Sequence, residues 1–289
     1  MPKVKVNGAE MYYEISGSGP YVLQVPGAVS GHEGYAAVTP GMAEHFKVID
    51  FDPRGYGLSD RPKQHYSFDG WAADMAGLLD ALAVERAHIH GGSMGGSLAI
   101  YYAAHYPNRV NGLVVSGSSA KSDHMAKYQY EVWKALARAY GTGSRELAFD
   151  QCNKAVSRQY LDGPNGGDSL VKAVMEVTRR NVETDVFCDA CDALIQMDMI
   201  SELERVTAPT LVMVGDQDVL TPADQGPDGA GGRFIYEHLI HSRFPEFVVI
   251  PDAGHANLMD NPEPSNRAVI EFLNRVGAQA PSGHPVADR

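Results

Sequence analysis

Cysteines and long apolar runs are both scarce in this chain. The 289 residues include only three cysteines, and an odd count in a long chain favours a reducing compartment over a disulfide framework. No apolar run approaches the ~20 residues that span a bilayer, and the N-terminus lacks the apolar segment of a secretory signal. We therefore expect a cytoplasmic protein with no membrane segment.

Positive charge is also in short supply. The chain has 24 Lys and Arg against 36 Asp and Glu, which gives a net charge of −12 at pH 7. This balance argues against nucleic acid and anionic membranes as partners. A small-molecule substrate is the partner we expect, and a homo-oligomer is compatible with the sequence.

Two of the cysteines, Cys188 and Cys191, have C-x-x-C spacing. A tetrahedral metal site would need a second pair of Cys or His nearby, and a redox motif would need a strand leading into it. Neither accompanies the pair. We interpret these two cysteines as structural and expect no metal there.

Short apolar segments alternate with helical ones through much of the chain. The predicted strands are Val4–Val6, Met11–Ile15, Tyr21–Val25, Val48–Phe51, His88–His90, Gly112–Val115, Thr210–Val214 and Phe247–Ile250. Helices are expected at Phe68–Leu82, Ser93–His105 and Pro262–Arg275. This alternation indicates a doubly wound α/β sheet. The first two strands have no helix between them and should form an antiparallel hairpin at the edge.

The alternation stops between about Ser118 and Val206. Helices are expected there at Asp123–Tyr140, Ser144–Gln159, Ser169–Thr184 and Phe187–Gln196. We expect an α/β core made of residues 1–117 and 206–276, a helical insertion at 118–205, and a poorly ordered tail at 277–289.

A glycine-crowded turn places Ser93 between a predicted strand and a predicted helix. The segment Gly91–Gly96 reads G-G-S-M-G-G and contains G-x-S-x-G. Side chains at Gly91 or Gly95 would collide with neighbouring backbone in such a turn, and the helix N-terminus favours developing negative charge. Neither a P-loop nor a dinucleotide fingerprint fits these residues. Ser93 is the candidate nucleophile, with a solvated turn as the alternative.

A nucleophilic serine needs a base and a carboxylate that orients the base. Asp216 and Asp218 follow the strand Thr210–Val214, and His255 follows Phe247–Ile250. All three therefore lie at the carboxyl ends of strands, where open α/β sheets bind their ligands. Other histidines that could act as the base are His90, His238 and His241.

Four motifs occur in the order of one known family. They are the elbow at Ser93, G-x-x-D-x-x-x-P at Gly215–Pro222, G-H followed by N-P-E at Gly254–Glu263, and D-x-R-G-x-G-x-S beginning at Asp52. In these motifs the sequence resembles an α/β-hydrolase. The resemblance implies an eight-stranded, mostly parallel sheet flanked by helices, with a helical cap inserted after the sixth strand. It also implies a catalytic triad of Ser93, Asp218 and His255, and its spacing selects Asp218 over Asp216.

The same resemblance implies an oxyanion hole made by the backbone N–H groups of Met94 and Ala28. The family usually has His-Gly where this chain has Pro26-Gly27. Since the donor is a backbone amide, loss of the histidine side chain need not remove it.

The overall layout resembles small-molecule hydrolases of aromatic degradation, particularly 3-oxoadipate enol-lactonases and carboxylesterases. We expect an ester or lactone hydrolase that forms an acyl-enzyme and needs no metal or organic cofactor. Rival functions are a carbon–carbon bond hydrolase of ring-cleavage products, a cofactor-free haloperoxidase or perhydrolase, and a slow-turnover ligand receptor. Three arginines could meet a substrate carboxylate, although a solvated helix face is their more ordinary role: Arg158, Arg179 and Arg180.

Overall fold

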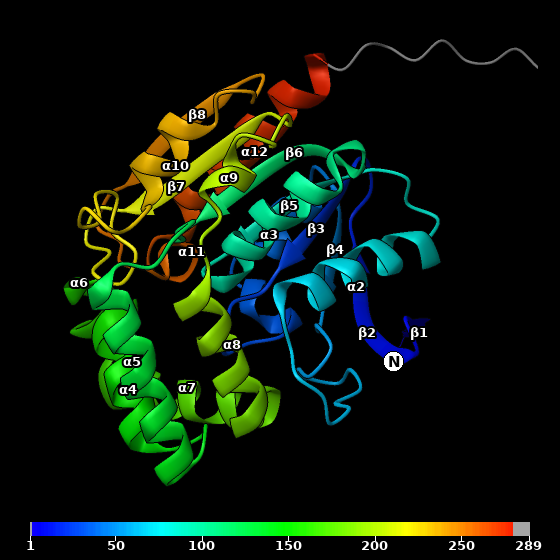
Figure 1. Ribbon diagram of the computed structural model, residues 1–289. Helices are drawn as coiled ribbons and strands as arrows, with labels where there is room; N and C mark the ends of the chain where they lie inside the picture. The colour runs from blue at the N-terminus through cyan, green and yellow to red at the C-terminus, as the bar shows by residue number, and fades with distance from the viewer. Residues whose placement is uncertain (1, 280–289) are drawn as a thin grey trace, which may run out of the picture.

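Eight strands form one sheet in the order β1-β2-β4-β3-β5-β6-β7-β8 (Figure 1). The computed structural model describes residues 2–279. The strands are β1 (Lys3–Val6), β2 (Ala9–Ser16), β3 (Tyr21–Val25), β4 (Lys47–Phe51), β5 (Ala87–Gly92), β6 (Val110–Ser116), β7 (Thr210–Gly215) and β8 (Pro245–Ile250). β2 pairs antiparallel with β1 and β4, and the remaining neighbours are parallel. The predicted mostly parallel sheet and its antiparallel edge hairpin are confirmed.

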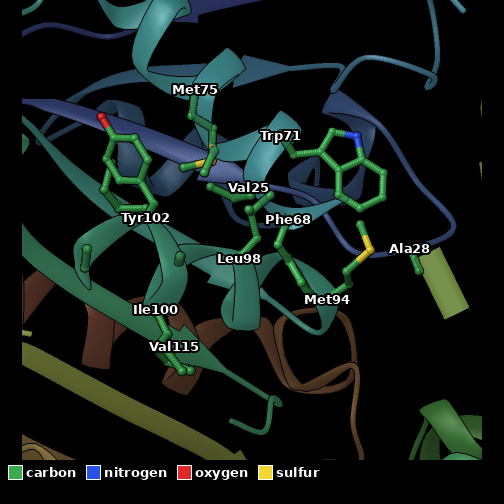
Figure 2. Close-up of a cluster of buried hydrophobic side chains, with 14 of the residues drawn as sticks. Val25, Ala28, Phe68, Trp71, Met75, Met94, Leu98, Ile100, Tyr102 and Val115 are labelled. Atoms are coloured by element: carbon green, nitrogen blue, oxygen red, sulfur yellow. The ribbon is translucent and has the colours of Figure 1, made fainter. Parts of the chain in front are cut away.

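Helices cover both faces of this sheet. The core helices are α1 (Thr39–Ala43), α2 (Phe68–Ala81), α3 (Met94–His105), α10 (Gly232–His238), α11 (Asn257–Asp260) and α12 (Pro262–Gln279), with short 3-10 turns η1 (His32–Tyr35) and η2 (Pro107–Arg109). One apolar cluster packs α2 and α3 on the first face, and a second packs α1 and α12 on the other. Figure 2 shows part of the first cluster, with side chains from β3, α2 and α3 gathered together.

The central strands β3, β4, β5, β6 and β7 are buried on both faces because helices cover both. In β6, Val114 belongs to the cluster under α12, whereas the next residue, Val115, belongs to the cluster under α3. Successive side chains of a strand point to opposite faces, so a doubly covered strand needs a continuous apolar run. This explains why the central strands read as apolar runs, whereas the edge strand β1 alternates Lys and Val.

The segment between β6 and β7 is helical, as expected. Its helices are α4 (His124–Tyr140), α5 (Arg145–Ala155), α6 (Arg158–Leu161), α7 (Gly167–Asn181), α8 (Thr184–Gln196) and α9 (Ile200–Leu203). Asp123 and Ser144 start α4 and α5 by accepting hydrogen bonds from the backbone N–H groups of Ala126 (2.8 Å) and Leu147 (3.4 Å). In Figure 1, α4, α5, α7 and α8 stand as a green group beside one end of the sheet.

The predicted helix Ser144–Gln159 is wrong in one respect, because it is broken into α5 and α6. Val156 between them is extended (φ −117°, ψ 159°), and the Ser157 hydroxyl then caps α6. The Ser157 N–H donates to the Asp260 carboxylate (2.7 Å), far away in the sequence. The break therefore lies where the helical segment is tied to the core.

Helix α12 extends to Gln279, beyond Gly277 where we expected the tail to begin. The rest of the tail prediction lies outside the described residues. The predicted boundaries at 117/118 and 205/206 lie between β6 and α4, and between α9 and β7. Across residues 2–279, every helix is too short or too polar to span a bilayer.

Candidate active site

Ser93 lies on a strained turn between β5 and α3. Its backbone has φ 57° and ψ −128°, a conformation that non-glycine residues rarely adopt. A Cβ added at Gly91 would clash with the backbone of Gly95, and one at Gly95 would clash with the backbone of Val25. The turn can therefore form only with glycines at these two positions.

His255 reaches Ser93 from the loop between β8 and α11. Its Nε2 lies 2.8 Å from the Ser93 Oγ, although the two residues are 162 positions apart. The adjacent Gly254 N–H donates to the Asp260 carboxylate (2.6 Å), which fixes the backbone of the loop. This geometry lets the imidazole accept the serine proton.

The second imidazole nitrogen of His255 faces both a carboxylate and a hydroxyl. Its Nδ1 lies 3.3 Å from Asp218 Oδ2 and 2.9 Å from Thr221 Oγ1, and that hydroxyl lies 2.8 Å from the same Asp218 oxygen. Sequence reasoning missed Thr221, even though it stands in the acid loop three residues after Asp218. The signal in the sequence was a hydroxyl side chain three residues after Asp218, close enough to reach its carboxylate.

The Asp218 carboxylate is buried and well supplied with donors. Its Oδ1 accepts from the backbone N–H groups of Leu220 (2.9 Å) and Thr221 (2.8 Å). Burial alone would raise the pKa of this carboxyl, but the charge of His255 and hydrogen bonds from His255 and Thr221 outweigh burial and lower the pKa. Asp218 is therefore ionised at neutral pH and can stabilise an imidazolium.

The alternative candidates for the acid and the base make their contacts away from Ser93. Asp216 Oδ1 accepts the backbone N–H of Ala253 (3.1 Å). His238 Nδ1 lies 2.9 Å from the backbone carbonyl oxygen of Phe234 on the same helix, α10. His90 is buried within β5, where burial lowers its pKa to about 3. The structure thus brings Ser93, Asp218 and His255 together, and not these other residues.

The loop after β3 approaches Ser93 closely. β3 and β5 are neighbours, with Val25 paired to Gly91, so their carboxyl ends meet. A Cβ at Gly27 would lie 3.2 Å from the Ser93 Cβ. Across residues 2–279, the backbone N–H groups of Ala28 and Met94 donate to no other protein group. Both amides are thus available near Ser93.

A cavity of about 350 Å³ opens over Ser93 and His255. The core contributes residues 27–30, 92–93 and 255–259 to its wall, and helices α4, α5 and α7 contribute the opposite side. Most of the lining is apolar, and it includes Trp133 and Cys152, whose thiol pKa burial raises to about 11. Sequence reasoning did not identify the polar members contributed by α5 and α7, Gln151 and Thr178.

One group of side chains within the described part has the spacing of metal ligands, namely His32, Glu33 and Asp52. Asp52 Oδ1 already accepts from the His32 backbone N–H (2.7 Å) and lies 2.8 Å from its Nδ1, while Oδ2 accepts from the Leu58 N–H (2.7 Å). Glu33 Oε1 accepts from Arg180 (2.8 Å). These contacts make the group a hydrogen-bonded brace of the loop after β4. The cysteines of the C-x-x-C pair are free and buried on α8.

Comparisons with known proteins agree with this architecture. The 3-oxoadipate enol-lactonase 2 of Acinetobacter baylyi is 28% identical over 235 residues, covering 80% of each chain. The 2-hydroxy-6-oxononadienedioate/2-hydroxy-6-oxononatrienedioate hydrolase of Paraburkholderia xenovorans is 30% identical over 274 residues, covering 91% of this chain and 90% of the relative.

Solved structures give the same result. A thermophilic esterase from Thermogutta terrifontis superimposes with a TM-score of 0.82 and 25% identity, covering 96% of this chain and 99% of the esterase. The family model described as alpha/beta hydrolase fold matches residues 20–262. The chain therefore belongs to the α/β-hydrolase fold family and is a hydrolase.

Proposed function

We propose that this hydrolase cleaves carboxylic esters or lactones of small organic molecules, with Ser93 as nucleophile, His255 as base and Asp218 as the orienting acid. The observation that carries the proposal is the 2.8 Å contact between Ser93 Oγ and His255 Nε2 at the wall of a mostly apolar cavity. Such a contact is what a serine needs to become nucleophilic at neutral pH.

The first half of the reaction forms an acyl-enzyme. Ser93 Oγ attacks the substrate carbonyl while His255 Nε2 takes its proton. The N–H groups of Met94 and Ala28 hold the negative charge that develops on the carbonyl oxygen. The carbon–oxygen bond then breaks, and the departing alkoxide takes the proton from His255.

The second half releases the acid. A water molecule attacks the acyl carbonyl and gives a proton to His255 Nε2, which returns it to Ser93 as the ester bond to the enzyme breaks. Asp218 stabilises the imidazolium in both halves. A lactone follows the same steps, except that its alcohol and acid remain parts of one molecule.

Hydrolysis of a carbon–carbon bond is the second candidate. It is favoured by the similarity to the Paraburkholderia xenovorans enzyme, which is named for a 6-oxo dienedioate substrate. A 2-hydroxy-6-oxo dienoate, whose conjugated absorbance is lost on cleavage, distinguishes the two functions. Turnover of this compound with no ester turnover would support the second candidate.

Steady-state hydrolysis of a short p-nitrophenyl ester tests the proposal. Ser93→Ala should lower the rate at least ~10⁴-fold, and His255→Ala should lower it about as much. The double variant should lose little more than either single variant, because the two residues act together. Ser201→Ala is a matched control, since this exposed serine hydrogen-bonds Glu202 on α9. Equal rates in wild type and Ser93→Ala would refute the proposal. One equivalent of product without further turnover would indicate a receptor.

A further inference from the structure

Two buried side chains in the wall of the active-site cavity have no hydrogen-bond partner on any of their polar atoms within the described residues. Gln151 on α5 is 5% exposed, and neither its amide oxygen nor its amide nitrogen is bonded within residues 2–279. The Thr178 hydroxyl on α7 is in the same situation, with 1% exposure. Both residues line the cavity, and α5 packs against α7.

An unpaired amide in an apolar wall discriminates between ligands. A glutamine side chain offers one acceptor oxygen and two N–H donors. In the ligand-free protein these groups are already buried and unpaired, so a purely hydrocarbon ligand leaves them without partners, whereas a ligand with a matching oxygen satisfies them and gains binding. The part of the cavity wall formed by α5 and α7 is therefore suited to a ligand with a polar group.

The charge of the cavity decides which polar group is suitable. No Lys or Arg of the described chain lines it. The arginines considered from the sequence, Arg158, Arg179 and Arg180, are exposed, and Arg180 is bound to Glu33. A substrate carboxylate would therefore lose water without gaining a cation, which is unfavourable.

The acidic group in the lining reinforces this conclusion. Glu33 lines the cavity. Burial alone would raise its carboxyl pKa, but hydrogen bonds from Asn181 and Arg180 outweigh burial and keep the pKa below its ordinary value. Glu33 is thus ionised at neutral pH and occupies the Arg180 guanidinium, so this arginine is not free to bind an anionic substrate.

We propose that Gln151, together with Thr178, forms a subsite for an uncharged oxygen-bearing group such as a ketone or hydroxyl. The substrates would then be neutral esters or lactones with a second polar group, and not carboxylates. The preference among substrates that are cleaved rests on the proposed hydrolase function, whereas the binding of a polar ligand by Gln151 does not depend on that function.

Three p-nitrophenyl esters of matched length test the subsite: the heptanoate, the 6-oxoheptanoate and the half-ester of adipate. They differ at the chain end by a hydrocarbon, a ketone and a carboxylate. We expect kcat/KM for the ketone to exceed that for the hydrocarbon by about ten-fold, the size of one good hydrogen bond. The carboxylate should fall at least ~ten-fold below the hydrocarbon.

Gln151→Met keeps the length of the side chain and removes its polar atoms. It should bring the ketone-to-hydrocarbon ratio of kcat/KM close to one. Gln159→Met is the matched control, since Gln159 is exposed, donates to Asp252 (3.2 Å) and does not line this cavity. Its ratio should stay at the wild-type value. Thr178→Val is a second, isosteric variant that should lower the ratio if Gln151→Met fails to fold.

Calorimetry separates failure of the subsite from failure of the hydrolase proposal. Ser93→Ala protein is titrated with 2-octanone and with heptanoate, which have nearly the same shape, and then compared with Ser93→Ala/Gln151→Met. If no ester is cleaved but 2-octanone binding needs Gln151, the hydrolase proposal fails and the subsite stands. Serine-dependent turnover that favours the adipate ester, or shows no ketone preference, overturns the subsite alone. Absence of 2-octanone binding also overturns it.

Discussion

Removing the Thr221 hydroxyl tests how the imidazole is held. This hydroxyl has one proton and lies between two partners, Asp218 Oδ2 at 2.8 Å and His255 Nδ1 at 2.9 Å. The direct contact between those partners is longer, at 3.3 Å. The arrangement that satisfies all three groups has the hydroxyl donating to the carboxylate and accepting from the Nδ1–H. His255 Nε2 is then free to accept the Ser93 proton.

The expected loss follows from this geometry. Thr221→Val has nearly the same shape and leaves both backbone donors to Asp218 Oδ1 in place, so the carboxylate stays anchored. What disappears is a hydrogen bond to a charged group in a buried place, since Thr221 is 3% exposed. Such bonds contribute about 1.5–3 kcal/mol. At 1.36 kcal/mol for each factor of ten, kcat should fall about ten-fold to a hundred-fold, with little change in KM.

Steady-state kinetics on a p-nitrophenyl ester measure this loss, and Thr221→Ser provides the rescue. Serine keeps the hydroxyl, so its kcat should return most of the way to the wild-type value. A kcat of Thr221→Val within about two-fold of wild type would refute the reasoning, because the 3.3 Å contact to Asp218 would then hold the ring unaided. Equal losses in the Ser and Val variants would assign the effect to shape and not to the hydroxyl.

Three carboxylates, Asp216, Asp218 and Asp50, give two further predictions. Asp218→Asn should lower kcat by ~10⁴-fold because an amide favours the wrong imidazole tautomer, while Asp216→Asn should stay within about five-fold. The reverse order would transfer the role to Asp216. Burial raises the pKa of Asp50 to about 7 from an ordinary value of 3.8. The folded state thus keeps a proton that the unfolded state loses, and stability falls as pH rises through this window by up to ~4 kcal/mol. Asp50→Asn should therefore unfold at higher urea concentration than wild type at pH about 8 and show little gain at pH about 4. An equal gain at both pH values would contradict this reasoning.

Local patterns in the sequence were sufficient to predict the elements of the core. Strands such as Thr210–Gly215 are runs of apolar residues, and they remain apolar on both faces because the sheet is doubly covered. The elbow around Ser93 was predictable for a similar reason, since its backbone conformation excludes side chains at neighbouring glycines. The break between α5 and α6 was not predictable, because Ser157 is held by Asp260 from a distant part of the chain.

The sequence by itself determined what depends on neighbouring residues: the order of strands and helices, the strained turn at Ser93, and the motifs that place an acid and a histidine after later strands. The tertiary structure decided which side chains meet. Only folding brings His255 to Ser93 across 162 positions, inserts Thr221 beside the imidazole, and leaves the buried amide of Gln151 in the cavity wall without a partner. These contacts depend on how distant elements pack, and helical or strand periodicity carries no information about the partner that a polar side chain will find.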